Sequence, residues 1–146
     1  MNVPMMKSMF LRAMARDCTL FSDYDDSHES IIRVTYNGDN LSEINVYVSF
    51  SLMDDGTMMA NVGNYDLPNF SSNLAAGYKA CNKANDDEMI KFYIDDDCDA
   101  VTQVTLIFNG YGISHDFSAE QVLCAAVQTA LAVDSAYPMF QSAKWA

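Results

Sequence analysis

The sequence predicts an α+β domain: a five-stranded antiparallel sheet with three helices, in the order α-β-β-β-α-β-β-α. Apolar and polar residues alternate in a series of short segments, which is the pattern of strands with one buried face. Three other segments carry apolar residues at helical spacing. The chain of 146 residues is long enough for one full core and too short for two, so we expect a single domain over residues 1–146.

The first helix is predicted from Pro4 to about Arg16, because the apolar residues of this segment fall on one side. Pro4 suits the first turn, where its missing N–H would have no partner within the helix. The following segment, Asp23 to Glu29, breaks all periodicity. We therefore predict that it is a loop.

Three strands are predicted next. The first two are Ile32 to Tyr36 and Ile44 to Leu52, in which apolar residues alternate with polar ones. The turn Met53 to Gly56 then closes a hairpin, because glycine adopts a positive φ without steric cost. The third strand runs from about Thr57 to Val62.

A second helix is predicted to open after Leu67, Pro68 and Asn69. Its predicted apolar face consists of Phe70, Leu74, Tyr78 and Cys81. Beside that face lies a flank of small residues: Ala76, Gly77, Ala80 and Ala84. Small side chains let another backbone come close, so the flank indicates a contact with the chain's own sheet or, alternatively, with a second subunit.

The second half ends in a hairpin and a long helix. The hairpin strands, Met89 to Ile94 and Gln103 to Phe108, surround an acidic turn, and the final helix is predicted to begin at Ser118 as its N-cap. Val122 to Val127 is apolar at every position, which is more than one buried stripe requires. Both sides must then be covered, by other elements of the chain or by a second subunit. Pro138 should bend or end the helix.

The charge of the chain restricts its partners. Eight basic and 20 acidic residues give a net charge of −12, which repels nucleic acid and attracts basic polypeptide segments. No stretch approaches the ~20 apolar residues of a membrane span. The four cysteines show no CxxC spacing, so we expect free thiols in a soluble, cytoplasmic protein with no membrane partner.

No set of residues spells out a catalytic or metal site. Asp95, Asp97 and Asp99 alternate as in a calcium loop, but the sixth position is Ala100 and the twelfth is Leu106. The run from Ser114 to Asp116 contains the residue types of a catalytic triad, yet adjacent side chains point apart. We therefore expect no enzyme activity, no cofactor and no specific metal ion.

The chain resembles the YbjN-domain family, whose fold is similar to that of the class I type III secretion chaperones. The resemblance is strongest over Asn69 to Phe140. It rests on a helix rich in asparagine, the strand Met89 to Ile94, the acidic turn DDDCD, the strand ending at Phe108 and the segment VDSAYPMF. The turn departs from the family pattern at Cys98, where glycine is usual, and the loop Asn109 to Phe117 is longer than expected.

The resemblance implies a non-enzymatic domain that dimerises and binds another polypeptide, or acts as a regulator. Strand edges of such folds hold extended segments. The predicted dimer or partner contacts are Ala76, Gly77, Ala80, Val122, Leu123 and Val127. A domain that senses a small molecule or an ion is the alternative.

Overall fold

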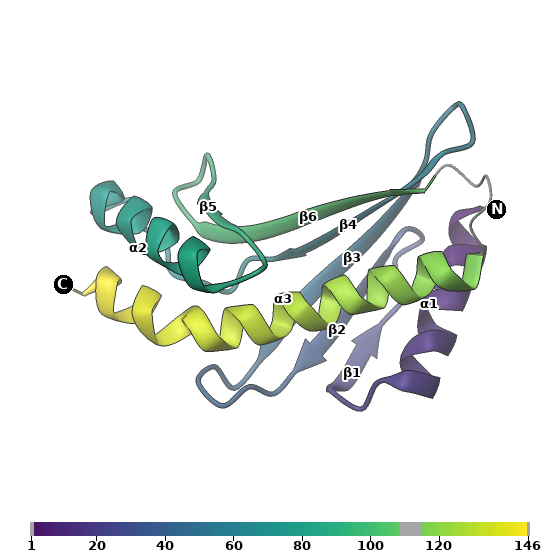
Figure 1. Ribbon diagram of the computed structural model, residues 1–146, viewed down its shortest axis with the longest axis horizontal. Coiled ribbons are helices and arrows are strands. Elements are labelled where there is room, and N and C mark those ends of the chain that lie inside the picture. The colour runs from purple at the N-terminus through teal and green to yellow at the C-terminus, as the bar shows by residue number, and fades with distance from the viewer. Residues whose placement is uncertain (1, 109–114, 146) are drawn as a thin grey trace.

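The structure is a computed structural model that describes residues 2–108 and 115–145, with Asp116 and Phe117 described for their backbone alone. Within these residues the chain forms three helices and one six-stranded antiparallel sheet (Figure 1). The elements are α1 (Val3–Asp17), β1 (Phe21–Asp25), β2 (Ile31–Tyr36), β3 (Ile44–Leu52), β4 (Met58–Asn64), α2 (Leu74–Asp87), β5 (Phe92–Ile94), β6 (Ala100–Phe108) and α3 (His115–Lys144). The predicted α+β class, with three helices on an antiparallel sheet, is confirmed.

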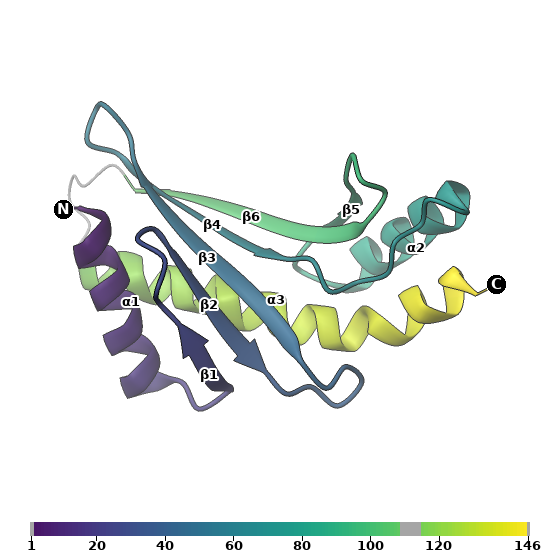
Figure 2. The same ribbon diagram turned by 180° about the vertical axis from the view of Figure 1, so that it is seen from behind.

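The domain has two layers. The strands lie in the order β1-β2-β3-β4-β6-β5, and α3 crosses one face of the sheet, where it contacts β3, β4 and β6 (Figure 1). The helix α1 packs on α3 and β3, and α2 lies beside β5 and the C-terminal part of α3. Seen from behind, the other face of the sheet is uncovered (Figure 2).

The core lies between the sheet and the helices. The rings of Phe10 on α1 and Phe50 on β3 meet edge to face, with centroids 6.3 Å apart. At the other end of α3, Phe140 contacts Phe92 at 5.3 Å and Phe70 at 6.3 Å. One helix of 30 residues, about 45 Å long, thus joins two aromatic clusters.

The prediction of five strands is wrong, because Phe21–Asp25 forms a sixth strand where a loop was expected to begin. Four of its five residues are exposed, and it pairs only with β2. A β-bulge shifts its register between Phe21 and Asp23. An edge strand of this kind buries no regular apolar face, so its sequence lacks the alternation that identifies the other strands.

The predicted apolar face of α2 is also wrong in part. Leu74 and Tyr78 are exposed, at 39% and 53%, and Phe70 precedes the helix. The buried face of the helix combines Cys81, from the predicted apolar face, with three residues of the small flank, Gly77, Ala80 and Ala84. The helix begins after Asn73, whose side chain accepts a hydrogen bond from Ala76 N at 3.1 Å. Because the helix begins at this position, its small residues face Phe70 and the sheet.

The N-terminal end of α3 differs from the prediction, and of the two effects expected of Pro138, ending the helix is excluded. The helix begins at His115, so Ser118 lies inside it and is buried rather than acting as the N-cap. The segment from His115 to Phe117 contains no Gly or Pro, so its residues can adopt the helical conformation before Ser118. Pro138 lies within the helix, which continues to Lys144. Most of the long loop expected before this helix, residues 109–114, lies outside the described residues.

Candidate functional site: the edge formed by β1

The six predicted contact residues fall into two separate places. Val122 is fully buried, whereas Leu123 and Val127 line a hollow beside the α1–β1 connection. Ala76 and Ala80 line a different hollow, about 290 Å³ in volume, together with Lys79, Lys83, Met139 and Ala143. The structure therefore does not bring the α2 and α3 residues together into one surface.

Gly77 is covered within the chain. A Cβ atom at this position would lie 2.8 Å from Phe70 Cβ and 3.1 Å from Ile94 Cδ1. The glycine is therefore required by a close internal contact, which is the first of the two interpretations that the small flank allowed. Ala76 is half-buried and remains accessible from outside.

The larger hollow, here called the helix-side hollow, has a volume of about 730 Å³. It lies between the end of α1, the start of β1 and the N-terminal half of α3. Its lining residues are Asp17, Cys18, Thr19, Leu20, Tyr36, Glu120, Leu123, Cys124 and Val127. Apolar side chains form much of the lining and two carboxylates lie on it. Burial, reinforced by the negative charges of Asp134 and Asp39, raises the pKa of Tyr36.

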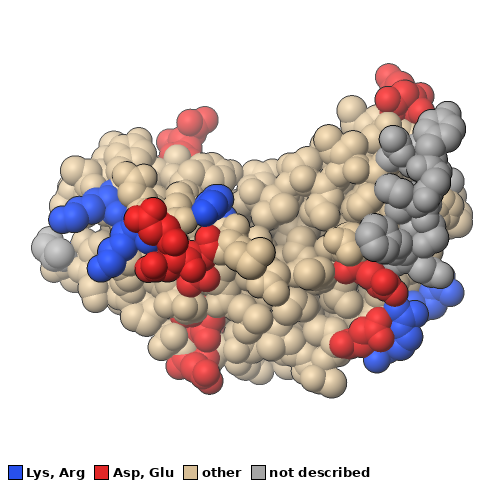
Figure 3. Space-filling view, in the orientation of Figure 1, with Lys and Arg blue, Asp and Glu red and all other residues tan. Residues whose placement is uncertain are grey.

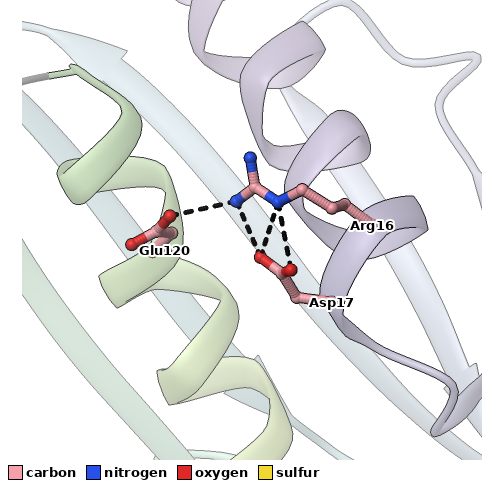
Figure 4. A network of polar contacts seen from close by, with 3 residues as sticks. All are labelled: Arg16, Asp17 and Glu120. Carbon is pink, nitrogen blue, oxygen red and sulfur yellow. Dashed lines mark hydrogen bonds and ion pairs between the residues drawn. The ribbon is translucent and has the colours of Figure 1, made fainter.

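An ion-pair network connects the helices at this hollow (Figure 4). Arg16 Nη2 contacts Asp17 Oδ2 at 2.7 Å and Glu120 Oε1 at 3.0 Å, so one guanidinium joins α1 to α3. The hydrogen bond from Arg16 holds the pKa of Asp17 below its usual value. All three side chains are about half exposed, so the network positions the helices more than it stabilises them.

The strand β1 forms a free edge next to this hollow. Its residues from Ser22 to Asp25 are exposed, and most contacts of α1 are with α3 and β3. Lys7 on α1 donates hydrogen bonds to the backbone oxygens of Asp26 and His28, just beyond the end of the strand. The edge is acidic, because it carries Asp23 and Asp25. Asp23 pairs with Arg33 at 3.2 Å, and hydrogen bonds from the side chain and the backbone N–H of Ser27 lower the pKa of Asp25. An unpaired strand edge offers backbone N–H and C=O groups to an incoming strand.

A second hollow, here called the open-face hollow, lies at the other end of β1 on the uncovered face. Its volume is about 340 Å³, and its lining residues are Asp25, Ser27, His28, Ile31, Arg33 and Tyr47. Arg33 Nε is buried and has no hydrogen-bond partner among the described residues. The two hollows therefore flank β1 on opposite faces, at ends about 13 Å apart.

The opposite edge of the sheet is closed. The side chain of Asn85 on α2 pairs with both backbone groups of Phe92 on β5: it accepts from the N–H at 2.7 Å and donates to the C=O at 3.0 Å. An amide side chain thus occupies the place of a neighbouring strand. β5 is also only three residues long. Of the two edges, β1 is the one that can accept an extended segment.

The acidic turn after β5 brings three carboxylates together. Oxygen atoms of Asp95, Asp97 and Asp99 lie within 4.8 Å of one another. Two of these side chains already serve the turn, because Asp95 accepts from the N–H groups of Asp97 and Asp99, and Asp99 accepts from Asn69 Nδ2 at 2.9 Å. These contacts account for the geometry of the cluster, and the absence of a specific ion stays a prediction.

The histidines are not placed in a catalytic arrangement within the described residues. His28 Nδ1 accepts a hydrogen bond from Ser30 N at 3.1 Å. Ser114 and the side chain of Asp116 lie outside the described part of the chain. The expectation that Ser114 to Asp116 form no catalytic triad therefore stays a prediction. The four cysteines are free thiols.

One described helix has the length and composition to cross a membrane. Ser118–Lys144 spans 27 residues, and half of its most apolar window, of mean hydropathy 1.2, is buried inside the domain. The core helix of a compact domain has the same properties, so this finding alone assigns no membrane role.

The β1 edge is not predictable from the sequence, because neither β1 nor the residues that line its hollows follow a local pattern. The one weak indication of a strand was the presence of two aromatic residues, Phe21 and Tyr24, in a polar segment that precedes the well-defined strand β2. Comparison with known proteins adds nothing to this geometry: no family model and no curated protein matches the chain.

Proposed function

We propose that the protein is a non-enzymatic polypeptide-binding domain of the YbjN type, with a fold similar to that of class I type III secretion chaperones. It holds an extended segment of a partner by adding a strand to β1. The observation that carries the proposal is the asymmetry of the sheet: the outer edge of β1 is exposed and has no strand partner among the described residues, whereas the outer edge of β5 is closed by Asn85.

The two hollows supply the specificity of this mode. In strand addition, main-chain hydrogen bonds give affinity and pockets for alternate side chains give selectivity. An apolar side chain of the partner enters the helix-side hollow next to Leu123 and Val127. A side chain directed to the opposite face reaches the open-face hollow next to Asp25 and Tyr47. Basic residues flanking the segment are attracted by the chain's charge of −12.

Backbone methylation of a bound peptide tests the mechanism. An extended peptide is first selected from a random displayed library, and two matched versions are made with methyl groups on alternate backbone nitrogens. Strand addition predicts that one version loses binding and the other keeps it, because only one set of N–H groups faces β1. Amide exchange should slow in Phe21–Asp25. Equal effects of the two methylation patterns, or protection confined to other elements, would contradict the proposal.

A homodimer is part of the same proposal. The α2–α3 hollow around Ala76 and Ala80 has small lining residues, so a second copy can approach closely. Light scattering should give the mass of a dimer at high micromolar concentration, and Ala76→Arg should shift it toward the monomer. A monomer mass for the unmodified chain would remove this part of the proposal and leave strand addition untouched.

The ion-sensing alternative is supported by one observation, the convergence of Asp95, Asp97 and Asp99. Calorimetric titration with calcium and magnesium distinguishes it from the main proposal. We expect no tight binding, because the loop lacks the glycine and the bidentate glutamate of a calcium site. A micromolar site that is weakened by Asp97→Ala would favour the alternative.

A further inference from the structure

The uncovered face of the sheet, here called the open face, has an unusual composition for so acidic a chain. None of the side chains that β3, β4, β5 and β6 direct to this face is charged. These residues are Asn45, Tyr47, Ser49, Ser51, Met59, Asn61, Gly63, Tyr93, Val101, Gln103, Thr105 and Ile107. The part of the open face formed by β3 to β6 is therefore neutral, on a molecule with a net charge of −12.

Tyrosine side chains are gathered on this face. The rings of Tyr47 and Tyr65 have centroids 6.0 Å apart and are tilted by 46°. Tyr65 lies over Gly63, where a Cβ atom would be 2.9 Å from the tyrosine oxygen. With Tyr93 on β5, these rings are between 39% and 52% exposed. Glycine thus allows one ring to lie close to the sheet while its outer surface remains accessible.

The amide groups of the open face present donors. Each of three amide oxygens accepts a hydrogen bond from a hydroxyl group of a neighbouring strand. The pairs are Thr35 to Asn45 at 2.9 Å, Thr105 to Asn61 at 2.6 Å and Tyr93 to Gln103 at 3.0 Å. Among the described residues, the NH2 groups of these three amides have no hydrogen-bond partner. Each of these amide oxygens thus already accepts one hydrogen bond, whereas the amide donors are free.

The face ends in charged residues at β1 and β2. One cross-strand line passes through Asp25, Arg33, Tyr47, Gly63 and Gln103, which are register partners on five successive strands. Four strand spacings make this line about 19 Å long. At its β1 end, Arg33 already pairs with a carboxylate, so Asp25 leaves that end with negative charge.

We propose that the open face binds a proline-rich segment in the polyproline II conformation, with basic residues at the end that lies over β1. Such a segment advances about 3.1 Å per residue, so about six residues span the line. Proline rings stack on the tyrosines, as they do in other aromatic-lined sites for proline-rich peptides. The flanking basic residues lie next to Asp25. At its β1 end this surface shares Asp25, Arg33 and Tyr47 with the open-face hollow. Binding there uses the face of the sheet and not the backbone edge of β1, so it does not depend on strand addition.

The donor pattern selects this ligand over two others. A proline residue offers a carbonyl acceptor and has no N–H, so a proline-rich backbone matches a surface of free amide donors. Sugar hydroxyls both donate and accept, so each would also need an acceptor on this face, whereas a proline-rich backbone offers acceptors alone. Single-stranded nucleic acid also stacks on aromatic rings, but it requires a cationic groove that the open face lacks.

The probe is a fluorescent peptide of six prolines with two lysines at one end, measured by fluorescence anisotropy. Its controls are a glycine-serine peptide of the same length and charge, and cellohexaose as a competitor. The proline peptide should bind at least roughly tenfold more tightly than the glycine-serine peptide, and the sugar should not displace it. Equal binding of the two peptides, or displacement by cellohexaose, would overturn the proposal.

Two matched pairs of variants locate the binding site. Tyr65→Ala should weaken binding roughly tenfold, whereas Tyr78→Ala, which removes an equally exposed tyrosine from α2, should not change it. Asn61→Asp keeps the acceptor for Thr105 and removes the free donors. It should weaken binding although its added negative charge attracts the lysines, while Asn82→Asp on α2 should not. Unchanged binding in both open-face variants would place the peptide elsewhere and contradict the proposal.

Discussion

At the scale of single residues, Cys98 shows a conflict between side chain and backbone. Its φ is 68°, which makes it the one described residue other than glycine with a positive φ. Its C=O nevertheless accepts a hydrogen bond from Phe70 N at 2.7 Å, and its N–H donates to Asp95 O at 3.0 Å, so the turn holds it in place. A residue with a Cβ atom in this region carries a strain of about 1–2 kcal/mol.

Cys98→Gly should therefore stabilise the protein. Glycine removes the steric strain but gains freedom in the unfolded chain, so the net increase in the free energy of unfolding should be about 0.5–1 kcal/mol. Urea denaturation measures it. Cys98→Ala is the control, because alanine keeps the Cβ atom and the strain. Equal stability of the two variants would show that the turn is not strained at this position.

Asp134 connects two distant parts of the chain. Its carboxylate accepts hydrogen bonds from the backbone N–H groups of Asp39 at 3.0 Å, Asn40 at 2.8 Å and Leu41 at 3.0 Å. A Cβ atom on Gly38 would lie 2.2 Å from Asp134 Oδ1, so the loop depends on glycine to come this close. One buried side chain on α3 thus fixes the connection between β2 and β3.

Removing this carboxylate should destabilise the fold. Asp134→Ala leaves three backbone donors without their acceptor, and the free energy of unfolding should fall by about 2–4 kcal/mol. Asp134→Asn keeps an oxygen acceptor and should cost less. The exposed neighbour provides the control Ser135→Ala, which we expect to be neutral in the same urea titration. A loss below about 0.5 kcal/mol for Asp134→Ala would show that water replaces the carboxylate.

These residues also show what a sequence can reveal. Gly56 was predicted to adopt a positive φ, and its φ is 84°, because a hairpin turn is a local structure with its own residue preferences. The partners of Asp134 lie more than 90 residues away, in the connection between β2 and β3, and no local pattern marks them. The sequence indicated a close contact at Gly77. That Phe70 is the residue in contact could be seen only in the folded structure.

At the scale of elements, the strongly periodic strands and the first helix were predicted within a few residues, whereas β1 was missed. The difference is burial. β3 alternates buried and accessible residues over nine positions, while β1 is exposed at four of five. The candidate site was missed for the same reason, since an exposed edge strand carries no pattern of buried residues.

The other edge depends on Asn85, which should be essential for closing β5. Asn85→Ala removes both hydrogen bonds to the backbone of Phe92, and the free energy of unfolding should fall by about 1–2 kcal/mol. The amide of Phe92 should exchange faster with solvent, while Asn82→Ala, at an exposed position of the same helix, should change neither quantity. An unchanged exchange rate at Phe92 would show that other contacts close this edge.

At the scale of the whole molecule, charge and apolar surface are separated. On the helix side, acidic and basic groups gather toward the two ends and leave a broad region without charge between them (Figure 3). The open face is neutral in its centre and acidic along β1, through Asp23 and Asp25. A partner attracted over a distance by a net charge of −12 is therefore guided to the molecule by charge and held by uncharged surfaces.

This separation predicts how salt affects capture of an extended peptide at β1. Raising the ionic strength from about 0.1 M to near 1 M shortens the screening length from ~10 Å to ~3 Å, so the association rate of a peptide with basic flanks should fall. Main-chain hydrogen bonds and the apolar contacts of the helix-side hollow act at short range, so a residual complex should remain at high salt. Stopped-flow fluorescence measures the rate. The control is a matched peptide whose basic residues are replaced by glutamine, which should associate slowly at every salt concentration. If its association rate depended on salt as strongly as that of the basic peptide, electrostatic attraction of the basic flanks would be ruled out.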